Sequence, residues 1–244
     1  MGTAIVVTSG KGGTGKTSIT GGVAGSLARL GHSVLCIDMD IGLRNLDISL
    51  GLSDRALMDF SDVAEGRCPL VRAAVNHPDL PGLALLTAPM TLSSALTEEA
   101  VRRMLDTARS LYDYVLIDSP AGLGTGFRMA CCAADRAIVV STNDASSLRD
   151  AQRTVGELDF LRQIHLVMNR IQTKMLRQLR TTIDDAMDTA GLPLLGVVPE
   201  DPQVMLSANL GRPLILGGRQ GAAIACLNIA KRLEGRRVPI MRIR

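Results

Sequence analysis

The feature that most constrains this chain is the glycine-rich segment at residues 10–17, Gly-Lys-Gly-Gly-Thr-Gly-Lys-Thr, which satisfies the pattern G-x-x-x-x-G-K-[ST]. An apolar run at residues 4–8 precedes this segment, and a helical pattern over residues 16–30 follows it. The glycines allow backbone N–H groups to converge on phosphate oxygens, and the helix presents its positive end to the same anion. Lys16 is expected to reach the β- and γ-phosphates, and the Thr17 hydroxyl to coordinate Mg²⁺. The segment therefore predicts a nucleoside triphosphate site.

Short apolar runs alternate with helix-length segments along the whole chain, and no linker, repeat or low-complexity tract divides it. The runs are rich in Val, Ile and Leu, which indicates strands of a parallel sheet that is covered on both faces. We expect an α/β fold with a doubly wound, mostly parallel sheet of about seven or eight strands and helices on both faces. The predicted strands are 4–8, 33–38, 83–87, 114–118, 137–141, 164–169 and 194–199, and the predicted helices are 16–30, 97–110, 145–161, 174–190 and 220–235.

The composition excludes several classes of protein. Hydrophobic residues make up 46% of the 244 residues and charged residues 21%, as in soluble globular chains and not in disordered ones. The chain has three Phe, two Tyr and no Trp, whereas modules that stack on nucleic-acid bases rely on aromatic side chains. No uninterrupted apolar stretch reaches the roughly 18 residues that cross a bilayer. The five cysteines lack a C-x-x-C spacing, which favours reduced thiols in a cytoplasmic protein.

A second lysine, Lys11, lies inside the glycine-rich segment, where the general pattern accepts any residue. With it, the string K-G-G-T-G-K-T resembles the deviant Walker A segment of the MinD/ParA family of P-loop ATPases. The resemblance implies ATP and Mg²⁺ as cofactors, and a homodimer in which Lys11 crosses to the partner subunit and, with Lys16, neutralises developing charge. The alternative is that Lys11 is a solvated loop charge. The nucleotide contacts expected from this segment are Gly10, Lys11, Gly12, Gly13, Thr14, Gly15, Lys16, Thr17 and Ser18.

Carboxylates follow two of the predicted strands, at the edge where α/β folds bind ligands. Asp38 and Asp40 begin the string D-M-D-I-G-L-R-N-L-D, and Asp118 is followed by S-P-A-G. Both strings resemble switch segments of the family. The resemblance implies that Asp40 positions the attacking water, that Asp38 supports the Mg²⁺ shell, and that Asp118 holds the ion together with Thr17. The alternative for Asp38 and Asp40 is that they only end a strand.

Two later segments are candidates for recognition of the base. Asn169 ends a predicted strand, and an Asn amide can both donate to and accept from adenine. The family has an Asn in the matching place, and the string V-P-E-D at residues 198–201 resembles its adenine-side loop. The resemblance implies nucleotide contacts by Asn169, Pro199, Glu200 and Asp201. The alternative for Asn169 is that it caps a strand end.

Residues 143–150 open a predicted helix and resemble the family segment that meets regulators and the dimer partner. The resemblance implies division-inhibitor and regulator proteins of the Min type as partners. Gln152 stands where some relatives carry an acid, so the identity of the regulator stays open. The alternative is a capped helix that faces solvent.

Positive charge is concentrated at the C-terminus. Residues 231–244 hold six basic residues and one acidic residue, whereas residues 1–230 hold 21 basic and 23 acidic residues. The first 230 residues therefore offer no basic cluster suited to a DNA face, and we expect no specific nucleic-acid partner. We divide the chain into an ATPase domain at 1–235 and a short basic amphipathic tail at 236–244.

The tail at 236–244 combines four arginines with apolar residues that could enter the headgroup region of an anionic membrane, namely Val238, Ile240, Met241 and Ile243. Pro239 limits any helix in the tail to about six residues, and helices this short are marginal. One tail is therefore expected to bind weakly, and two tails in a dimer more firmly. The alternative is a frayed, solvated tail.

These features together predict a Mg²⁺-dependent ATPase that acts as a switch. ATP would close a homodimer that associates peripherally with the membrane and regulates the placement of the cell-division site, and hydrolysis would release it. One alternative is a DNA-partition or flagellar-placement ATPase of the ParA type. Another is a metabolic P-loop ligase, against which the presence of Lys11 counts.

Overall fold

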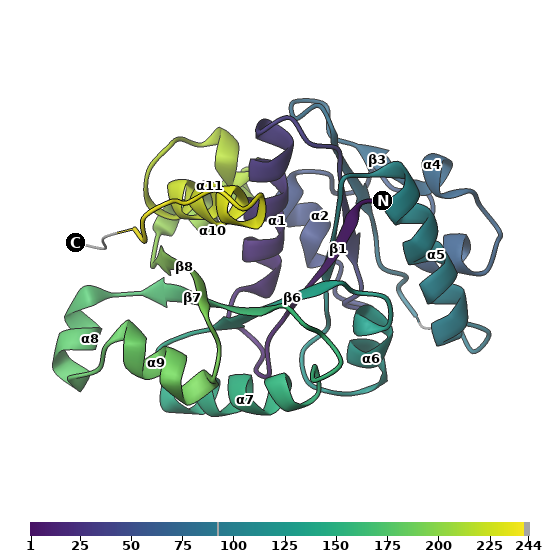
Figure 1. The fold of residues 1–244 in the computed structure, drawn as a ribbon. Helices are drawn as coiled ribbons and strands as arrows, with labels where there is room; N and C mark the ends of the chain where they lie inside the picture. The colour runs from purple at the N-terminus through teal and green to yellow at the C-terminus, as the bar shows by residue number, and fades with distance from the viewer. Residues whose placement is uncertain (92, 242–244) are drawn as a thin grey trace.

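The strands of the computed structural model, which describes residues 1–91 and 93–241, form one eight-stranded sheet in the order β3-β4-β2-β5-β1-β6-β7-β8 (Figure 1). Every neighbouring pair is parallel except β3 and β4. The expected doubly wound, mostly parallel sheet is therefore confirmed. The strands are β1 (Thr3–Thr8), β2 (Val34–Asp38), β3 (Val75–Asn76), β4 (Leu83–Leu86), β5 (Tyr114–Asp118), β6 (Arg136–Ser141), β7 (Ile164–Ile171) and β8 (Leu194–Pro199).

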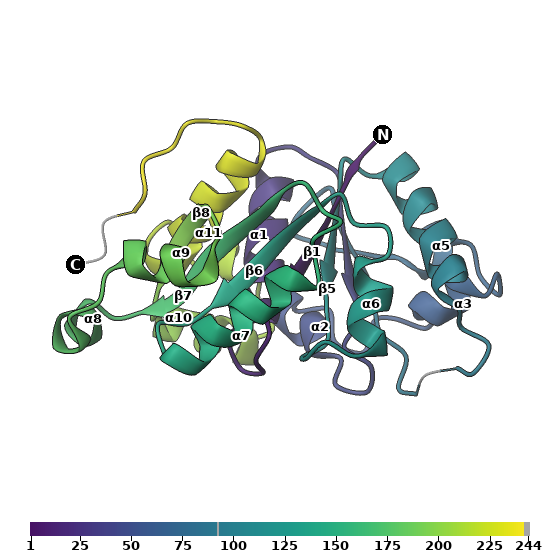
Figure 2. The same cartoon turned by 60° about the horizontal axis from the view of Figure 1, so that its bottom comes forward.

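Helices cover both faces of the sheet, and each face has its own apolar core. Ile5 and Val7 of β1 point into one core with α1 and α11, whereas Ala4 and Val6 point into the other with α5, α6, α7 and α9 (Figures 1 and 2). Burial on both faces explains why the strands are continuously apolar. The helices are α1 (Lys16–Arg29), α2 (Asn45–Leu50), α3 (Phe60–Ala64), α4 (Leu70–Ala73), α5 (Glu98–Leu111), α6 (Thr125–Cys131), α7 (Ala145–Gly156), α8 (Thr173–Leu179), α9 (Ile183–Ala190), α10 (Pro202–Asn209) and α11 (Gly221–Leu233), with a 3₁₀ turn at Leu214–Leu216.

The expectation of one helix over residues 174–190 was wrong. The segment forms two helices, α8 and α9, because Arg180 adopts a left-handed conformation with φ of 53° that ends the first one. Thr182 then caps α9 by accepting a hydrogen bond from the backbone N–H of Asp185. The helix expected over 145–161 is also shorter and ends at Gly156.

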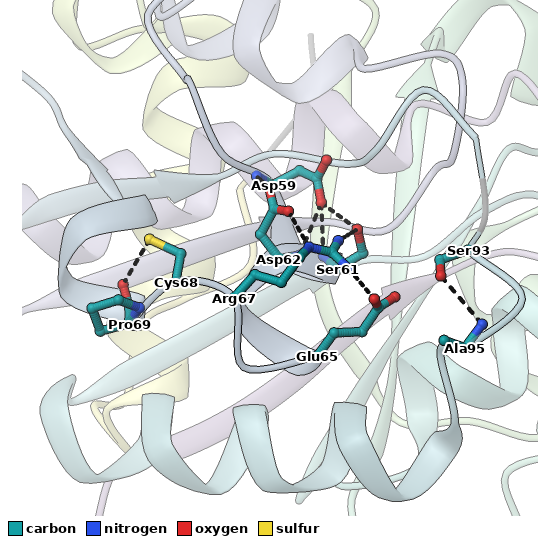
Figure 3. A network of polar contacts seen from close by, with 9 residues as sticks. All are labelled: Asp59, Ser61, Asp62, Glu65, Arg67, Cys68, Pro69, Ser93 and Ala95. Carbon is teal, nitrogen blue, oxygen red and sulfur yellow. Dashed lines mark hydrogen bonds and ion pairs between the residues drawn. The ribbon is translucent and has the colours of Figure 1, made fainter.

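A polar network holds the segment around α3, which the sequence analysis did not predict as a helix (Figure 3). Asp59 caps α3 by accepting from the backbone N–H of Ser61 at 2.8 Å, and the Asp62 carboxylate accepts from the Asp59 N–H at 3.0 Å. Arg67 donates to Asp62 at 2.8 Å and pairs with Glu65. The Asp59–Asp62 pair is a capping box, which satisfies two backbone donors at the start of the helix.

Residues 236–241 of the predicted tail form neither helix nor strand, and Arg242, Ile243 and Arg244 lie outside the described residues. Arg232 of α11 donates to the carbonyl oxygens of Val238 and Pro239, at 3.0 Å and 2.6 Å, and also to that of Leu195 in β8. Met241 is half-buried against the core that contains α11. The first part of the tail is therefore attached to the body. No helix in the described part of the chain is long and apolar enough to cross a bilayer.

Candidate functional site

The glycine-rich segment joins β1 to α1 at the carboxyl edge of the sheet, where β1 lies between β5 and β6. Gly15 precedes α1 with φ of 92°, a left-handed conformation that L side chains rarely adopt. A Cβ on Gly15 would lie 2.3 Å from Nδ2 of Asn169, and a Cβ on Gly10 would lie 2.3 Å from the carbonyl oxygen of Asp150. The loop is therefore packed so closely that only glycine fits at these two positions.

Lys16 is buried at the start of α1, with 8% of its surface exposed. Burial lowers the pKa of its ammonium group, while Asp118 and Asp40 act in the opposite direction. A buried ammonium group is costly unless an anion compensates it. The surroundings of Lys16 thus favour the arrival of phosphate.

Thr17 and Asp118 meet directly, as their predicted shared role requires. The Thr17 hydroxyl donates to Oδ2 of Asp118 at 2.7 Å, and the Thr20 hydroxyl lies 3.2 Å from Oδ1. Burial raises the pKa of Asp118 to about 7 against these hydrogen bonds, and the nearby Asp38 raises it further. The sequence analysis missed Thr20. Its spacing of three residues from Thr17, which puts both hydroxyls on one side of α1, was the available signal.

Asp38 lies beside Asp118 in the sheet register, but its carboxylate faces its own loop. Oδ1 accepts from the N–H of Asp40 at 2.9 Å and Oδ2 from the N–H of Leu46 at 3.1 Å. Burial raises the pKa of Asp38 to about 6. Asp38 therefore shapes the loop that carries Asp40. For the half-buried Asp40 itself, burial raises the pKa and Lys16 lowers it.

The donor set fits Mg²⁺ held mainly by a nucleotide. Asp118 brings a carboxylate and Thr17 a hydroxyl, and beside them lies the carboxylate of Asp38, which also accepts from its own loop. The described residues contain no group of three or more His, Cys, Asp or Glu side chains that could hold a metal ion. Mg²⁺ prefers oxygen ligands and usually keeps water and phosphate oxygens in its shell. The buried Thr14 hydroxyl also has no hydrogen-bond partner among the described residues, so it is available to a ligand in the loop.

A cavity of about 520 Å³ adjoins the loop and has the size of a small-ligand site. It contains four of the predicted base contacts, Asn169, Pro199, Glu200 and Asp201, together with the predicted Ser18. Val198, which begins the string V-P-E-D, also lines it. The sequence analysis missed the other lining residues, namely Ile19, Arg170, Pro202, Val204, Met205, Ala208, Leu214, Ala222 and Cys226. These residues come from several elements, and no local string predicts that they meet.

Two of the predicted base contacts also hold the protein together. Asn169 donates from Nδ2 to the carbonyl oxygen of Thr14 at 2.8 Å and so joins β7 to the phosphate loop. Asp201 caps α10 by accepting from the N–H of Gln203 at 2.9 Å, and it accepts from the N–H of Ala222 at 2.8 Å. Asn169 can position the loop and still line the cavity, whereas both carboxylate oxygens of Asp201 are engaged in the protein.

Lys11 lies on the outer side of the loop and contacts its own chain. Its ammonium group lies 3.2 Å from Oδ1 of Asp144 and 2.8 Å from the Ser146 hydroxyl, at the start of α7. Burial opposes ionisation of Asp144, but hydrogen bonds, with Ser146 first among them, hold its pKa well below the usual range. The segment at 143–150 therefore meets the loop through Lys11. A second cavity, of about 610 Å³ and lined by residues such as Leu148, Gln152 and Ala186, lies between α7 and α9.

Fold and site together define a P-loop nucleotide-binding protein of the α/β class. Residues 5–214 match the family described as the CobQ/CobB/MinD/ParA nucleotide binding domain, and the chain belongs to this family. It is 39% identical to the septum site-determining protein MinD of Synechocystis, over 97% of this chain and 91% of that protein.

Solved structures agree with this assignment. A chain of the MinC:MinD cell division protein complex of Aquifex aeolicus has a TM-score of 0.91 at 37% identity, and the match covers 98% of both chains. MinD of Pyrococcus horikoshii, solved with Mg-ADP, has a TM-score of 0.84 at 28% identity, with 96% of both chains covered.

Proposed function

We propose that this protein is a Mg²⁺-dependent ATPase that dimerises on ATP, associates with the membrane in that state and regulates the placement of the cell-division site. The observation that carries the proposal is the convergence of Lys16, Thr17, Asp40 and Asp118 on one glycine-rich loop. The names of its relatives, septum site-determining proteins, support the biological role. A regulator of the Min type is the proposed partner, since one similar structure is a MinC:MinD complex.

Each residue of the site has a role in this proposal. Lys16 binds the β- and γ-phosphates, and Asp40 accepts a hydrogen bond from the attacking water. Thr17, Asp38 and Asp118 would hold Mg²⁺, directly or through water, and the ion would neutralise charge on the phosphate oxygens. Because Asp38 also accepts from the N–H groups of the Asp40 loop, a change at the phosphates can reach that loop through it.

Measuring the rate of ATP turnover tests the proposed catalytic role of Asp40. We expect Asp40→Asn to lower turnover about 100-fold or more while ATP binding persists, because positioning of a reacting proton is worth at least that much. Asp47→Asn, seven residues further along the chain in α2, is the matched control and should turn over ATP near the wild-type rate. Normal turnover by the Asp40→Asn variant would contradict the proposed role of Asp40 in positioning the attacking water.

Measuring the ATP-dependent dimer in variants tests the role of Lys11. We expect Lys11→Ala to abolish the ATP-dependent dimer on size-exclusion chromatography, because its cation would be supplied to the partner subunit. Asp144→Asn is the control, since it weakens the contact with Lys11 within the chain but retains an oxygen that can cap α7. A dimer lost equally in both variants would mean that the contact within the chain, and not a contact in trans, is what matters.

Vesicle binding tests the membrane part. The chain should co-sediment with anionic vesicles in ATP more than in ADP, and deletion of residues 236–244 should reduce this binding. Equal sedimentation in all three conditions contradicts the proposed membrane switch.

A further inference from the structure

Helix α8 projects from the carboxyl end of β7 at one end of the molecule (Figures 1 and 2). None of its residues is buried. Met175 and Leu179 are 46% and 52% exposed and, four residues apart, lie on the same side of the helix. A helix of a globular protein normally turns its apolar side chains toward the core. Met175 and Leu179 thus form a half-exposed apolar face, and Leu179 also lines the cavity between α7 and α9.

The same helix carries exposed cations. Lys174, Arg177 and Arg180 are all exposed, and no carboxylate of the described residues lies within 4.0 Å of their charged groups. Residues 160–183 contain five basic and no acidic residues. The sequence analysis, which asked only for a basic cluster suited to a DNA face, did not single out this segment. Net charge averaged over the whole domain concealed the cluster.

The helix is held in place from its inner side. Leu176 is half-buried against the core beneath α7 and α9. The N–H of Thr181 donates to the carbonyl oxygen of Leu176 at 3.1 Å, and its hydroxyl accepts from Nδ2 of Asn143 at 3.1 Å. The exposed side chains are therefore presented on an anchored helix.

The basic tail runs toward the same end of the molecule. In both views the described tail residues, 236–241, lead from α11 toward the end where α8 lies (Figures 1 and 2). The tail shares the chemistry of α8, with arginines beside apolar residues such as Ile240 and Met241. Two weak membrane contacts on one molecule reinforce each other through effective concentration.

We propose that α8 is a second membrane-contacting surface, in which Lys174, Arg177 and Arg180 bind anionic lipid headgroups and Met175 and Leu179 enter the headgroup boundary. Opposite charge and an apolar face are the two properties that an interfacial helix requires. The inference rests on the proposed association with the membrane. It adds a contact that acts together with the tail.

Co-sedimentation of the full-length chain with ATP and vesicles containing phosphatidylglycerol tests the inference. One variant, Met175→Ser with Leu179→Ser, removes the apolar face, and a second, Arg177→Gln, removes one cation. The control is Val71→Ser with Arg72→Gln on α4, which exposes the same kinds of side chain at the other end of the molecule (Figure 1). ATP turnover and circular dichroism establish that each variant folds.

We expect the Arg177→Gln change to weaken vesicle binding about fivefold, as one cation near an anionic surface contributes about 1 kcal/mol. The apolar variant should weaken binding by at least as much, and the α4 control should bind like the wild type. Wild-type binding by both α8 variants, with loss on deletion of 236–244, overturns this inference and leaves the proposed function intact. No sedimentation of the wild-type chain overturns both.

Double-stranded DNA provides the competing outcome. A short duplex of random sequence is titrated into the wild-type chain and the Arg177→Gln variant, and fluorescence anisotropy measures binding. If the variant loses DNA binding but retains vesicle binding, the surface binds nucleic acid and the inference is overturned. If the variant loses vesicle binding and the wild type does not bind the duplex, the result supports the lipid surface.

Discussion

Replacing the glycines of the phosphate loop one at a time by alanine should produce a graded loss of stability. Gly12 has an unstrained backbone and a Cβ there would meet nothing closer than 3.9 Å, so Gly12→Ala should be close to neutral. Gly13 has φ of 80° with open space around it, so Gly13→Ala should lose about 1–2 kcal/mol to backbone strain alone. At Gly15 the same strain is joined by a Cβ 2.3 Å from Nδ2 of Asn169. That contact displaces the hydrogen bond from Asn169 to Thr14, worth about 1 kcal/mol.

The expected loss for Gly15→Ala is therefore about 2–3 kcal/mol in the free energy of unfolding. Urea denaturation followed by far-ultraviolet circular dichroism measures it, because the chain has no Trp to report by fluorescence. Nucleotide affinity measured by titration calorimetry should fall in the same order. Equal stability of the Gly12→Ala and Gly15→Ala variants would refute the argument from strain and contact.

Three further predictions concern other parts of the molecule. The pKa of Asp118 is about 7 and that of a free Asp about 4, so the native state binds more protons between these values. The free energy of unfolding without nucleotide should therefore fall as pH rises from about 4 to about 7 and level off above that. Asp118→Asn should flatten this dependence in urea titrations; an unchanged slope would contradict it. Asp59→Ala should cost about 1 kcal/mol in thermal unfolding as a lost helix cap, and Arg67→Ala less, as its ion pairs are half exposed. Arg232→Gln should release the tail and speed trypsin cleavage at Arg236, seen by mass spectrometry, whereas unchanged cleavage would mean that these hydrogen bonds do not hold the tail.

Local strings of residues were sufficient to predict the phosphate loop. The apolar run 4–8, the glycine-rich segment 10–17 and the helical pattern 16–30 predicted a strand, a loop and a helix in that order, and the structure has β1, the loop and α1 at those places. Continuous apolar runs predicted seven of the strands, because burial on both faces removes the alternation of polar residues. The two-residue strand β3 was missed, since Val75 and Asn76 carry no pattern of their own. Short helices such as α3 were missed for a related reason, because a turn or two gives no periodicity to detect.

The carboxylates show where prediction from sequence ends. The positions of Asp38 and Asp118 after apolar runs placed both at one edge of the sheet, and the register confirms that they are neighbours. Their hydrogen bonds could not be predicted. That Asp38 holds the loop of Asp40, and that Thr20 joins Thr17 on Asp118, depends on how the loop and α1 pack.

The sequence by itself determined the class of fold, the glycine-rich loop and the acidic residues that end the strands, because each of these has a pattern in short stretches of the chain. The tertiary structure alone decided which segments share the cavity beside Asn169 and that Lys11 contacts Asp144. These contacts depend on crossovers that join residues distant in sequence. Net charge and local patterns carry no information about such long-range contacts, which the packing of the elements determines.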